Sequence, residues 1–178
     1  CRIRQITKTL LIELEKQVGN KWYAHEEIEN ISAASTMHDV GKISVPDYIL
    51  NKPGKLTAEE FEIMKEHTVN GCKILDSIDM IKCSPMYKYY YDICRSHHER
   101  WDGRGYPDGL VGDMIPISAQ IVSVADVYDA LTSKRVYKPP YSHEKAVDMI
   151  LNGECGKFNP DIIECLKNCH MELKDILD

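Results

Sequence analysis

Apolar side chains recur every three or four positions along almost the whole chain, and this spacing limits the fold more than any other feature of the sequence. The pattern places apolar residues on one face of an α-helix, whereas a half-buried strand needs strict alternation. No alternating pattern persists in the 178 residues, so the sequence predicts a single all-α domain, a helical bundle spanning residues 1–178. The clearest stretch is residues 2–18, with Ile3, Ile6, Leu10, Leu11, Leu14 and Val18 as its apolar positions.

Local signals mark where the other helices begin and where loops interrupt them. Thr57 and Glu60 form a capping-box pattern, which predicts a helix start at this point. Residues 45–50 are expected as an ordered loop or short turn. Residues 101–116 contain four glycines and two prolines, so they are expected as a long loop of the kind that commonly carries function. Helices are expected over residues 24–39, 57–75, 85–97, 117–135, 142–151 and 159–166.

Charge and cysteine content exclude several classes of protein. Lys and Arg number 22 against 28 Asp and Glu, and the net charge of −6 argues against a broad DNA-binding surface. No apolar run approaches the ~20 residues of a membrane span, so no membrane contact is expected of this domain. The seven cysteines contain no CxxC pair, which favours a reducing cytoplasm over a disulfide framework. Because the chain begins with Cys1, we expect a C-terminal output part of a longer protein, whose upstream region could be membrane-tethered.

Histidines and aspartates form the pattern that carries chemistry. Each histidine alone is readily explained as structural or solvated, and Asp126 alone as a helix cap or an ion-pair partner. Together, imidazoles and carboxylates without thiolates suit iron, manganese, zinc or another first-row cation. Asp126 stands where the helical pattern expects an apolar residue, so it needs a cation or strong donors. The candidate ligands are His38, Asp39, His67, His97, His98 and Asp126.

The sequence around these residues resembles the HD-GYP family of metal-dependent phosphodiesterases. The resemblance extends over roughly residues 1–170 in the family's order. A His-Asp pair by itself would indicate only the broad HD superfamily, whereas the stretch over residues 97–107 followed by ADxxDA is highly specific. The matching segments are residues 38–43 (HDVGKI), 46–50 (PDYIL), 67–75, 97–107 (HHERWDGRGYP), 115–116, 125–132 (ADVYDALT) and 135–138.

The resemblance implies a helical bundle that binds two or three divalent cations. Iron or manganese is expected, with zinc, nickel and magnesium as alternatives. The implied substrate is cyclic di-GMP, hydrolysed to linear pGpG and to GMP, and some relatives act on cyclic GMP-AMP. The six candidates above become metal ligands, with Asp39 as the bridging, catalytic carboxylate.

Residues near these ligands acquire roles in the same way. Lys42 is expected to act in catalysis and to bind a substrate phosphate, and Arg135 and Lys138 to bind substrate. Tyr106 either stacks on a guanine or pins its own loop, and Asp129 is expected to orient a ligand histidine. Glu99 and Arg100 are expected to form a structural ion pair or to support the ligands. Surface positions are expected for His25, His143 and His170.

The match fails at the start of the chain, which leaves alternatives open. Cys1 stands where the family usually supplies a further histidine, so it is an additional candidate metal ligand, and Gln120 replaces a common arginine. The alternative function is an inactive domain that binds a cyclic dinucleotide or docks a diguanylate cyclase through the loop over residues 101–107. A third is a different phosphohydrolase of the HD superfamily that acts on nucleoside monophosphates, which would leave residues 99–107 and 135–138 unexplained. A homodimer is also open.

Overall fold

The computed structural model describes residues 1–19, 25–134 and 139–177. Within these residues the regular elements are helices, and the single β-type contact is an isolated bridge between Asp102 and Val111, so the all-α prediction is confirmed. The elements are α1 (Arg2–Val18), α2 (His25–Ala34), η1 (Ser35–Met37), η2 (Val40–Ser44), α3 (Asp47–Leu50), α4 (Ala58–Asp76), α5 (Asp79–Lys82), α6 (Tyr87–Ser96), η3 (Gly112–Met114), α7 (Ile117–Thr132), α8 (His143–Leu151) and α9 (Pro160–Asp175).

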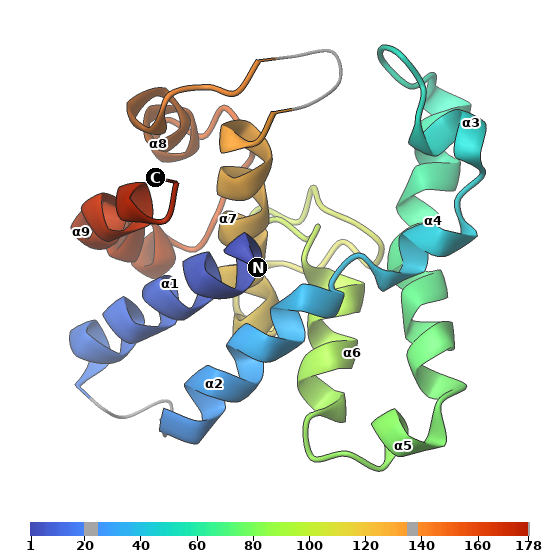
Figure 1. Cartoon of the computed structure of the whole chain (residues 1–178), viewed down its shortest axis with the longest axis horizontal. Coiled ribbons are helices and arrows are strands. Elements are labelled where there is room, and N and C mark those ends of the chain that lie inside the picture. The colour runs from blue at the N-terminus through green and yellow to red at the C-terminus, as the bar shows by residue number, and fades with distance from the viewer. Residues whose placement is uncertain (20–24, 135–138, 178) are drawn as a thin grey trace.

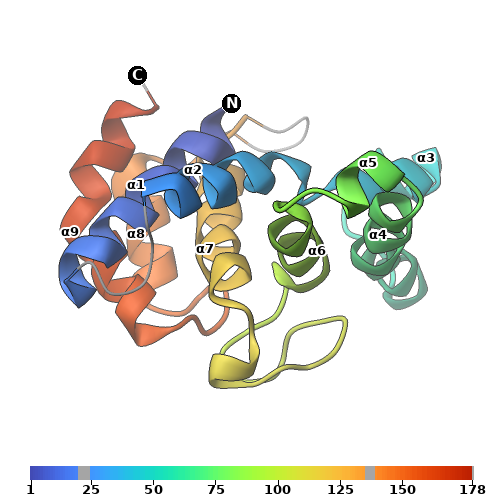
Figure 2. The same cartoon turned by 90° about the horizontal axis from the view of Figure 1, so that it is seen from below.

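Helix α7 occupies the middle of the molecule (Figure 1). It packs against α1 and α8 on one side and against α6 on the other, and α6 in turn packs against α4. The short 3-10 helix η2 lies on α4. Figure 2 shows that the loop between α6 and α7 projects away from the layer of helices. The junctions of α4, α6 and α7 therefore bring together segments that are far apart in the sequence.

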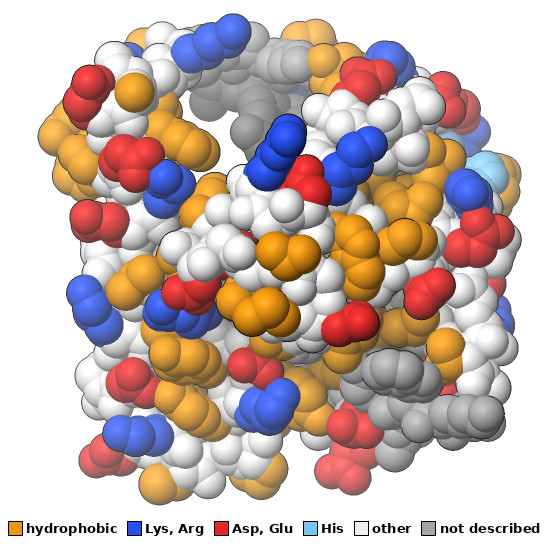
Figure 3. Space-filling view, turned by 180° about the vertical axis from the view of Figure 1, so that it is seen from behind, with side chains coloured by type: hydrophobic (Ala, Val, Ile, Leu, Met, Phe, Trp, Pro, Cys, Tyr) orange, Lys and Arg blue, Asp and Glu red, His pale blue; other side chains and the backbone are white. Residues whose placement is uncertain are grey.

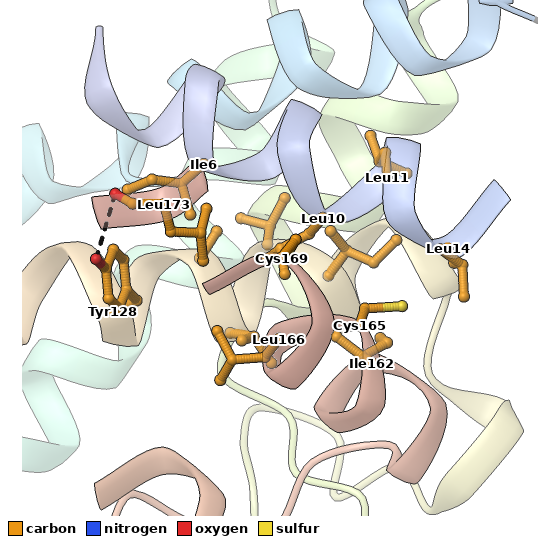
Figure 4. Packing of buried hydrophobic residues seen from close by; sticks show 14 of the residues in the cluster. Ile6, Leu10, Leu11, Leu14, Tyr128, Ile162, Cys165, Leu166, Cys169 and Leu173 are labelled. Carbon is orange, nitrogen blue, oxygen red and sulfur yellow. Dashed lines mark hydrogen bonds between the residues drawn. The ribbon is translucent and has the colours of Figure 1, made fainter. Parts of the chain in front are cut away.

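The main core lies between α1, α7 and α9 (Figure 4). The predicted stripe on α1 is buried from Ile3 to Leu14, and each such side chain contributes roughly 1.5–3 kcal/mol when fully buried. Cys165 and Cys169 lie on the buried face of α9. A second, smaller cluster joins α4 to α6 through Cys72, Leu75 and Cys94. The two clusters hold the helices that carry the candidate ligands.

Helix starts follow the predicted caps closely. The capping box of Thr57 and Glu60 is present at the start of α4, with both of its reciprocal hydrogen bonds. Ser142 and Asn159 accept backbone N–H groups at the starts of α8 and α9. These local signals need no tertiary contact, which is why the sequence suffices to predict them.

Several elements and boundaries differ from the prediction. The helix expected over residues 24–39 ends at Ala34 and continues as the 3-10 helix η1, which aims His38 inward. The segment 45–50, expected as a loop, contains α3, because Pro46 fits before a helix although it would break one from inside. Helix α5 was not predicted, since four residues are too few to show a period. In addition, α7 ends at Thr132, before the expected residue 135.

In the part of the chain that the structure covers, none of the helices is both long and apolar enough to traverse a bilayer.

Candidate metal centre

Four structural elements supply the side chains of the candidate centre. His38 and Asp39 lie between η1 and η2, and His67 lies in the middle of α4. His97 ends α6 and is followed directly by His98, while Asp126 lies on α7. Because η2 lies on α4, α4 packs on α6 and α6 packs on α7, these segments meet at one place.

Gly41 allows the first of these segments to approach α4. A Cβ atom on Gly41 would lie 1.9 Å from the carbonyl oxygen of His67 and 2.5 Å from the backbone nitrogen of Gly71, which is far inside van der Waals contact. Only glycine permits so close an approach of two backbones. The glycine that follows the His-Asp pair therefore places Asp39 against His67.

Backbone carbonyl groups fix the tautomer of three imidazoles. A carbonyl oxygen only accepts hydrogen bonds, so the Nδ1 atom of each ring carries the proton and Nε2 keeps its lone pair. This is the form in which histidine binds a metal ion. The acceptors are the carbonyl groups of Ser35 for His38 (2.7 Å), Met64 for His67 (2.7 Å) and Ile93 for His97 (2.8 Å).

The three Nε2 atoms converge on Asp39. Its Oδ2 lies 3.3 Å from Nε2 of His38, and its Oδ1 lies 3.4 Å from Nε2 of His67 and 3.7 Å from Nε2 of His97. On the other side of His38, Oδ1 of Asp126 lies 3.5 Å from the same Nε2 atom. One carboxylate thus faces imidazoles from three segments, which is the arrangement expected of a bridging ligand.

Several buried polar atoms in this cluster have no hydrogen-bond partner among the described residues, and this shows whether a cation would fit. Oδ1 of Asp39 and the Nε2 atoms of His67 and His97 are buried and have no hydrogen-bond partner in the described part of the chain. His67 and His97 are 1% and 0% exposed, so water does not solvate them freely. An unpaired buried polar group costs about 1–3 kcal/mol. A divalent cation would satisfy all three atoms at once, so the residues present fit a metal.

Apart from His38, whose raised pKa means that it must lose a proton before it binds a metal ion, the charge states agree with this interpretation. Burial opposes ionisation of Asp39 and Asp126, but hydrogen bonds to His38 hold the pKa of both carboxyl groups below the usual range. Burial lowers the pKa of His67 to about 4, and burial together with the neighbouring imidazoles lowers the pKa of His98. Burial alone would lower the pKa of His38, yet hydrogen bonds to the two carboxylates raise it to about 10. Ionised carboxylates and neutral imidazoles are the states that metal ligands need.

All six predicted ligands fall into two groups of donor atoms that lie close enough to hold a metal ion. Within each group the donor atoms lie within 4.8 Å of one another, and His97 belongs to both. Cys1 belongs to neither group and is exposed at the start of α1. The first group is Asp39, His67, His97 and His98, and the second is His38, His97 and Asp126.

The other predicted site residues divide into three cases. Nζ of Lys42 lies 2.5 Å from Oδ2 of Asp39, so its ammonium group is at the centre as expected. Arg135 and Lys138 lie outside the described residues. Asp129 was expected to orient a ligand histidine, but its Oδ1 pairs with Nε of Arg2 at 2.8 Å. This carboxylate joins α7 to α1 instead, because it lies on the side of α7 that faces α1.

Tyr106 contacts the centre through His98. The two rings stack with their centroids 4.7 Å apart, and Tyr106 meets Phe61 of α4 edge to face at 5.9 Å. Lys65 lies over both rings, 5.6 Å from the centroid of Phe61 and 5.9 Å from that of Tyr106. The loop-pinning alternative accounts for these contacts, and stacking on a guanine stays a prediction.

Glu99 and Arg100 do not form the ion pair that was offered as one alternative. Glu99 is 2% exposed and accepts the backbone N–H groups of residues 108–110 at 2.7, 3.1 and 3.0 Å. Nη1 of Arg100 donates to Oγ of Ser123 at 2.7 Å. Sequence reasoning missed that Glu99 binds the loop. The signal was the loop itself, because the backbone N–H groups of a glycine-rich turn need an acceptor.

The expectation of surface positions holds for His25 but is wrong for His143. His143 is only 6% exposed. Its Nδ1 atom forms a hydrogen bond with the hydroxyl group of Tyr128 at 2.8 Å, and its Nε2 atom lies 3.2 Å from Nδ1 of His170. These polar groups connect α7, α8 and α9 within the core. Of these three helices, only α7 also carries a candidate ligand.

Comparison with known proteins shows which family the chain is related to. The sequence profile of the HD domain family matches residues 7–162. A cyclic di-GMP phosphodiesterase of Vibrio cholerae is 46% identical over 138 residues, which cover 77% of this chain and 28% of the relative. A 3'3'-cGAMP-specific phosphodiesterase of the same organism is 43% identical over 143 residues, covering 80% of this chain and 27% of the relative. The chain thus spans about a third or less of the length of these relatives.

A solved structure gives the same fold. An HDG"Y"P protein from Bdellovibrio bacteriovorus superposes with a TM-score of 0.67 over 98% of this chain and 51% of the other, at 21% sequence identity. The profile match, the relatives and the converging histidines agree with the motifs in the sequence. The chain therefore belongs to the HD domain family, and its motifs resemble those of the HD-GYP group.

Proposed function

We propose that residues 1–178 form one phosphodiesterase domain that hydrolyses cyclic dinucleotides, with cyclic di-GMP as its main substrate. Relatives with this activity in their names are 43% and 46% identical over about three quarters of the chain or more. The observation that carries the proposal is the convergence of six imidazole and carboxylate side chains in two donor groups that share His97, with Lys42 beside them.

In the proposed reaction, water adds to phosphorus and the bond from phosphorus to the 3′ oxygen breaks, with a proton passing to that oxygen. The first hydrolysis opens the ring to linear pGpG, and a second hydrolysis gives two molecules of GMP. When bound, divalent cations supply Lewis acidity toward the anionic diester and toward the attacking water.

We propose that two cations bind, one for each donor group, with Asp39 as the bridge. Asp39 faces the imidazoles of both groups, which supports this role. A set of imidazoles and carboxylates suits iron or manganese, with zinc, nickel and magnesium as weaker candidates. Because Cys1 is exposed and lies outside both groups, we assign it no metal. A third cation would need a donor set beyond the two that the described residues form.

Lys42 is proposed to hold a phosphate oxygen of the substrate. Its Nζ atom already lies against Asp39, and its side chain is 38% exposed, so the ammonium group can reach a ligand in the centre. A charge-assisted hydrogen bond to a phosphate is about twice as strong as a neutral one. We propose further phosphate or base contacts for Arg135 and Lys138, on the strength of the family motif alone.

The experiment is hydrolysis by protein that is purified without oxygen and loaded with iron or manganese. We expect loss of cyclic di-GMP, with pGpG and then GMP as products on anion-exchange chromatography. Treatment with a chelator should stop the reaction, and metal should restore it. If the loaded protein leaves both cyclic di-GMP and 3'3'-cGAMP intact, the proposal is wrong.

Elemental analysis separates this function from the alternative binding module. We expect about two metal ions per chain, one for each donor group. Near-zero metal together with retained binding of cyclic di-GMP would identify an inactive domain that senses the dinucleotide.

Exposed side chains bear on partners other than the substrate. The loop over residues 101–107 projects from the fold and carries Arg104, whose side chain is 88% exposed, so we propose it as the contact for a diguanylate cyclase. On the face seen in Figure 3, acidic and basic side chains are interspersed, which supports the proposal that DNA is not a ligand. We propose a cytoplasmic reaction, in keeping with the free cysteines. A homodimer stays a prediction.

A further inference from the structure

A cavity of about 220 Å³ adjoins the metal centre along α7. His98 and Asp126 contribute to its lining and connect it to the donor groups. Much of the rest of its lining is apolar, with Val127 and Leu131 from α7 and Tyr141 from the segment before α8. Its volume is below the roughly 300–1,000 Å³ of pockets for whole drug-sized ligands. The cavity therefore suits one flat ring system next to a phosphate that the centre holds.

Arg100 contributes the positive charge in the lining of this cavity. Its Nη1 atom donates to Oγ of Ser123 at 2.7 Å and to the carbonyl oxygen of Glu99 at 2.9 Å. Its Cζ atom lies over the ring of Phe158, 5.1 Å from the centroid. These contacts hold the guanidinium in one orientation before any ligand arrives, which reduces the entropy lost on binding.

The same guanidinium has donors to spare. Arginine carries five N–H groups in a planar fork. No described carboxylate lies within ion-pair distance of Arg100, and its hydrogen bonds to described residues all leave from Nη1, so Nε and Nη2 have no hydrogen-bond partner among the described residues. A partly buried guanidinium without an anion, in the lining of an apolar cavity, indicates a ligand that presents hydrogen-bond acceptors.

We propose that the cavity holds one guanine base of the substrate and that Arg100 donates to O6 and N7 of that base, an inference that rests on the proposed function. Guanine presents two adjacent acceptors on this edge, which match the arginine fork, whereas adenine presents one acceptor and one donor. Arg100 is thus a specificity-determining residue that selects guanine over adenine. Both substrates named for the relatives, cyclic di-GMP and 3'3'-cGAMP, contain at least one guanine.

A phosphate is the rival ligand for Arg100. The apolar walls formed by Val127, Leu131 and Tyr141 favour an aromatic ring over a hydrated anion. A phosphate contact would also not distinguish guanine from adenine. The comparison of the two bases therefore decides between these ligands.

The test measures binding and hydrolysis in wild-type protein and in Arg100→Lys, which keeps the charge but loses the fork. Calorimetry gives the affinities for GMP and AMP, and kinetics gives kcat/KM for cyclic di-GMP, cyclic di-AMP and bis(p-nitrophenyl) phosphate, a diester without a base. We expect Arg100→Lys to narrow the preference for GMP over AMP roughly tenfold or more, and that for cyclic di-GMP over cyclic di-AMP in parallel. Arg4→Lys, on the exposed outer side of α1, is the matched control and should change neither preference.

An unchanged preference in folded Arg100→Lys would overturn the inference, because a merely structural role, or a phosphate contact, would affect both bases alike. If this variant does not fold, Ala130→Phe fills the same cavity from α7 and should weaken GMP binding by tenfold or more; unchanged GMP affinity would then overturn it. Failure of the proposed function would give a different result in the same experiments. Wild-type protein would hydrolyse none of the diesters and would still prefer GMP to AMP.

Discussion

Nε2 of His67 lies 3.4 Å from Oδ1 of Asp39, and both atoms are buried without a hydrogen-bond partner among the described residues. They come from α4 and from the turn between η1 and η2. Two polar atoms so placed are costly unless a third group lies between them. This relationship, repeated for His97, is the reason that a metal centre accounts for the cluster better than a network of hydrogen bonds.

Asp39→Ala should reduce both metal content and hydrolysis. The substitution removes the carboxylate that faces three imidazoles, so we expect turnover to fall on the order of 10³-fold or more. Elemental analysis and cyclic di-GMP hydrolysis check this. Asp148→Ala, exposed on α8, is the control. Activity equal to wild type in Asp39→Ala would show that the centre is misplaced.

Lys42→Met should separate substrate binding from metal binding. The ammonium group lies 2.5 Å from Oδ2 of Asp39 but is no metal ligand, so the metal content should stay at the wild-type level. Loss of one hydrogen bond to a charged group is worth about 1.5–3 kcal/mol, which lowers kcat/KM roughly 10- to 100-fold. Lys55→Met, also exposed, should have no effect. A variant that loses its metal would contradict this assignment.

Glu99→Gln should loosen the loop that follows His98. The carboxylate accepts three backbone N–H groups from residues 108–110, and a neutral amide offers only one acceptor oxygen for them. We expect a loss of about 1–3 kcal/mol of stability and faster hydrogen exchange at those three amides. Glu62→Gln, exposed on α4, serves as the control. Unchanged exchange would mean that other contacts hold the loop.

Stability should depend on the pH through His143. Burial lowers the pKa of this imidazole below its ordinary value of 6.5, so below about pH 6.5 the unfolded chain binds more protons than the folded one. The free energy of unfolding should therefore fall as the pH drops from 7.5 to 5.5.

The groups that face this imidazole are Tyr128 of α7, Glu144 and the pair of His170 and Lys174 on α9. Urea unfolding of wild type and His143→Gln, both without metal, measures the contribution of His143. The variant should lose less stability over this pH range than wild type does. An equal loss in both proteins would assign the pH dependence to other groups.

Much of the candidate site could be predicted from sequence because its candidate ligands lie near local signals. His38 and Asp39 adjoin a glycine that must approach another backbone, and His97 and His98 end a helix before a glycine-rich loop. Asp126 interrupts an apolar helical face. Each of these signals occupies only a few consecutive residues, so it can be read without knowing what packs against it.

The errors concern residues whose partners come from distant helices. Asp129 pairs with Arg2, and His143 contacts Tyr128 and His170, because α1, α8 and α9 pack around α7. Nothing within one turn of Asp129 or His143 in the sequence indicates those contacts. The structural role of Glu99 was missed for the same reason, since its donors lie nine to eleven residues away.

The sequence by itself therefore determined the helical class, the caps and the set of candidate ligands, since periodicity and capping depend on neighbours along the chain. Only the tertiary structure decided which polar atoms are buried, which of them remain without partners, and which residues line the cavity beside Arg100. Burial and pairing depend on the packing of helices that are far apart in the chain, and the free energy of a charged or polar group depends on both.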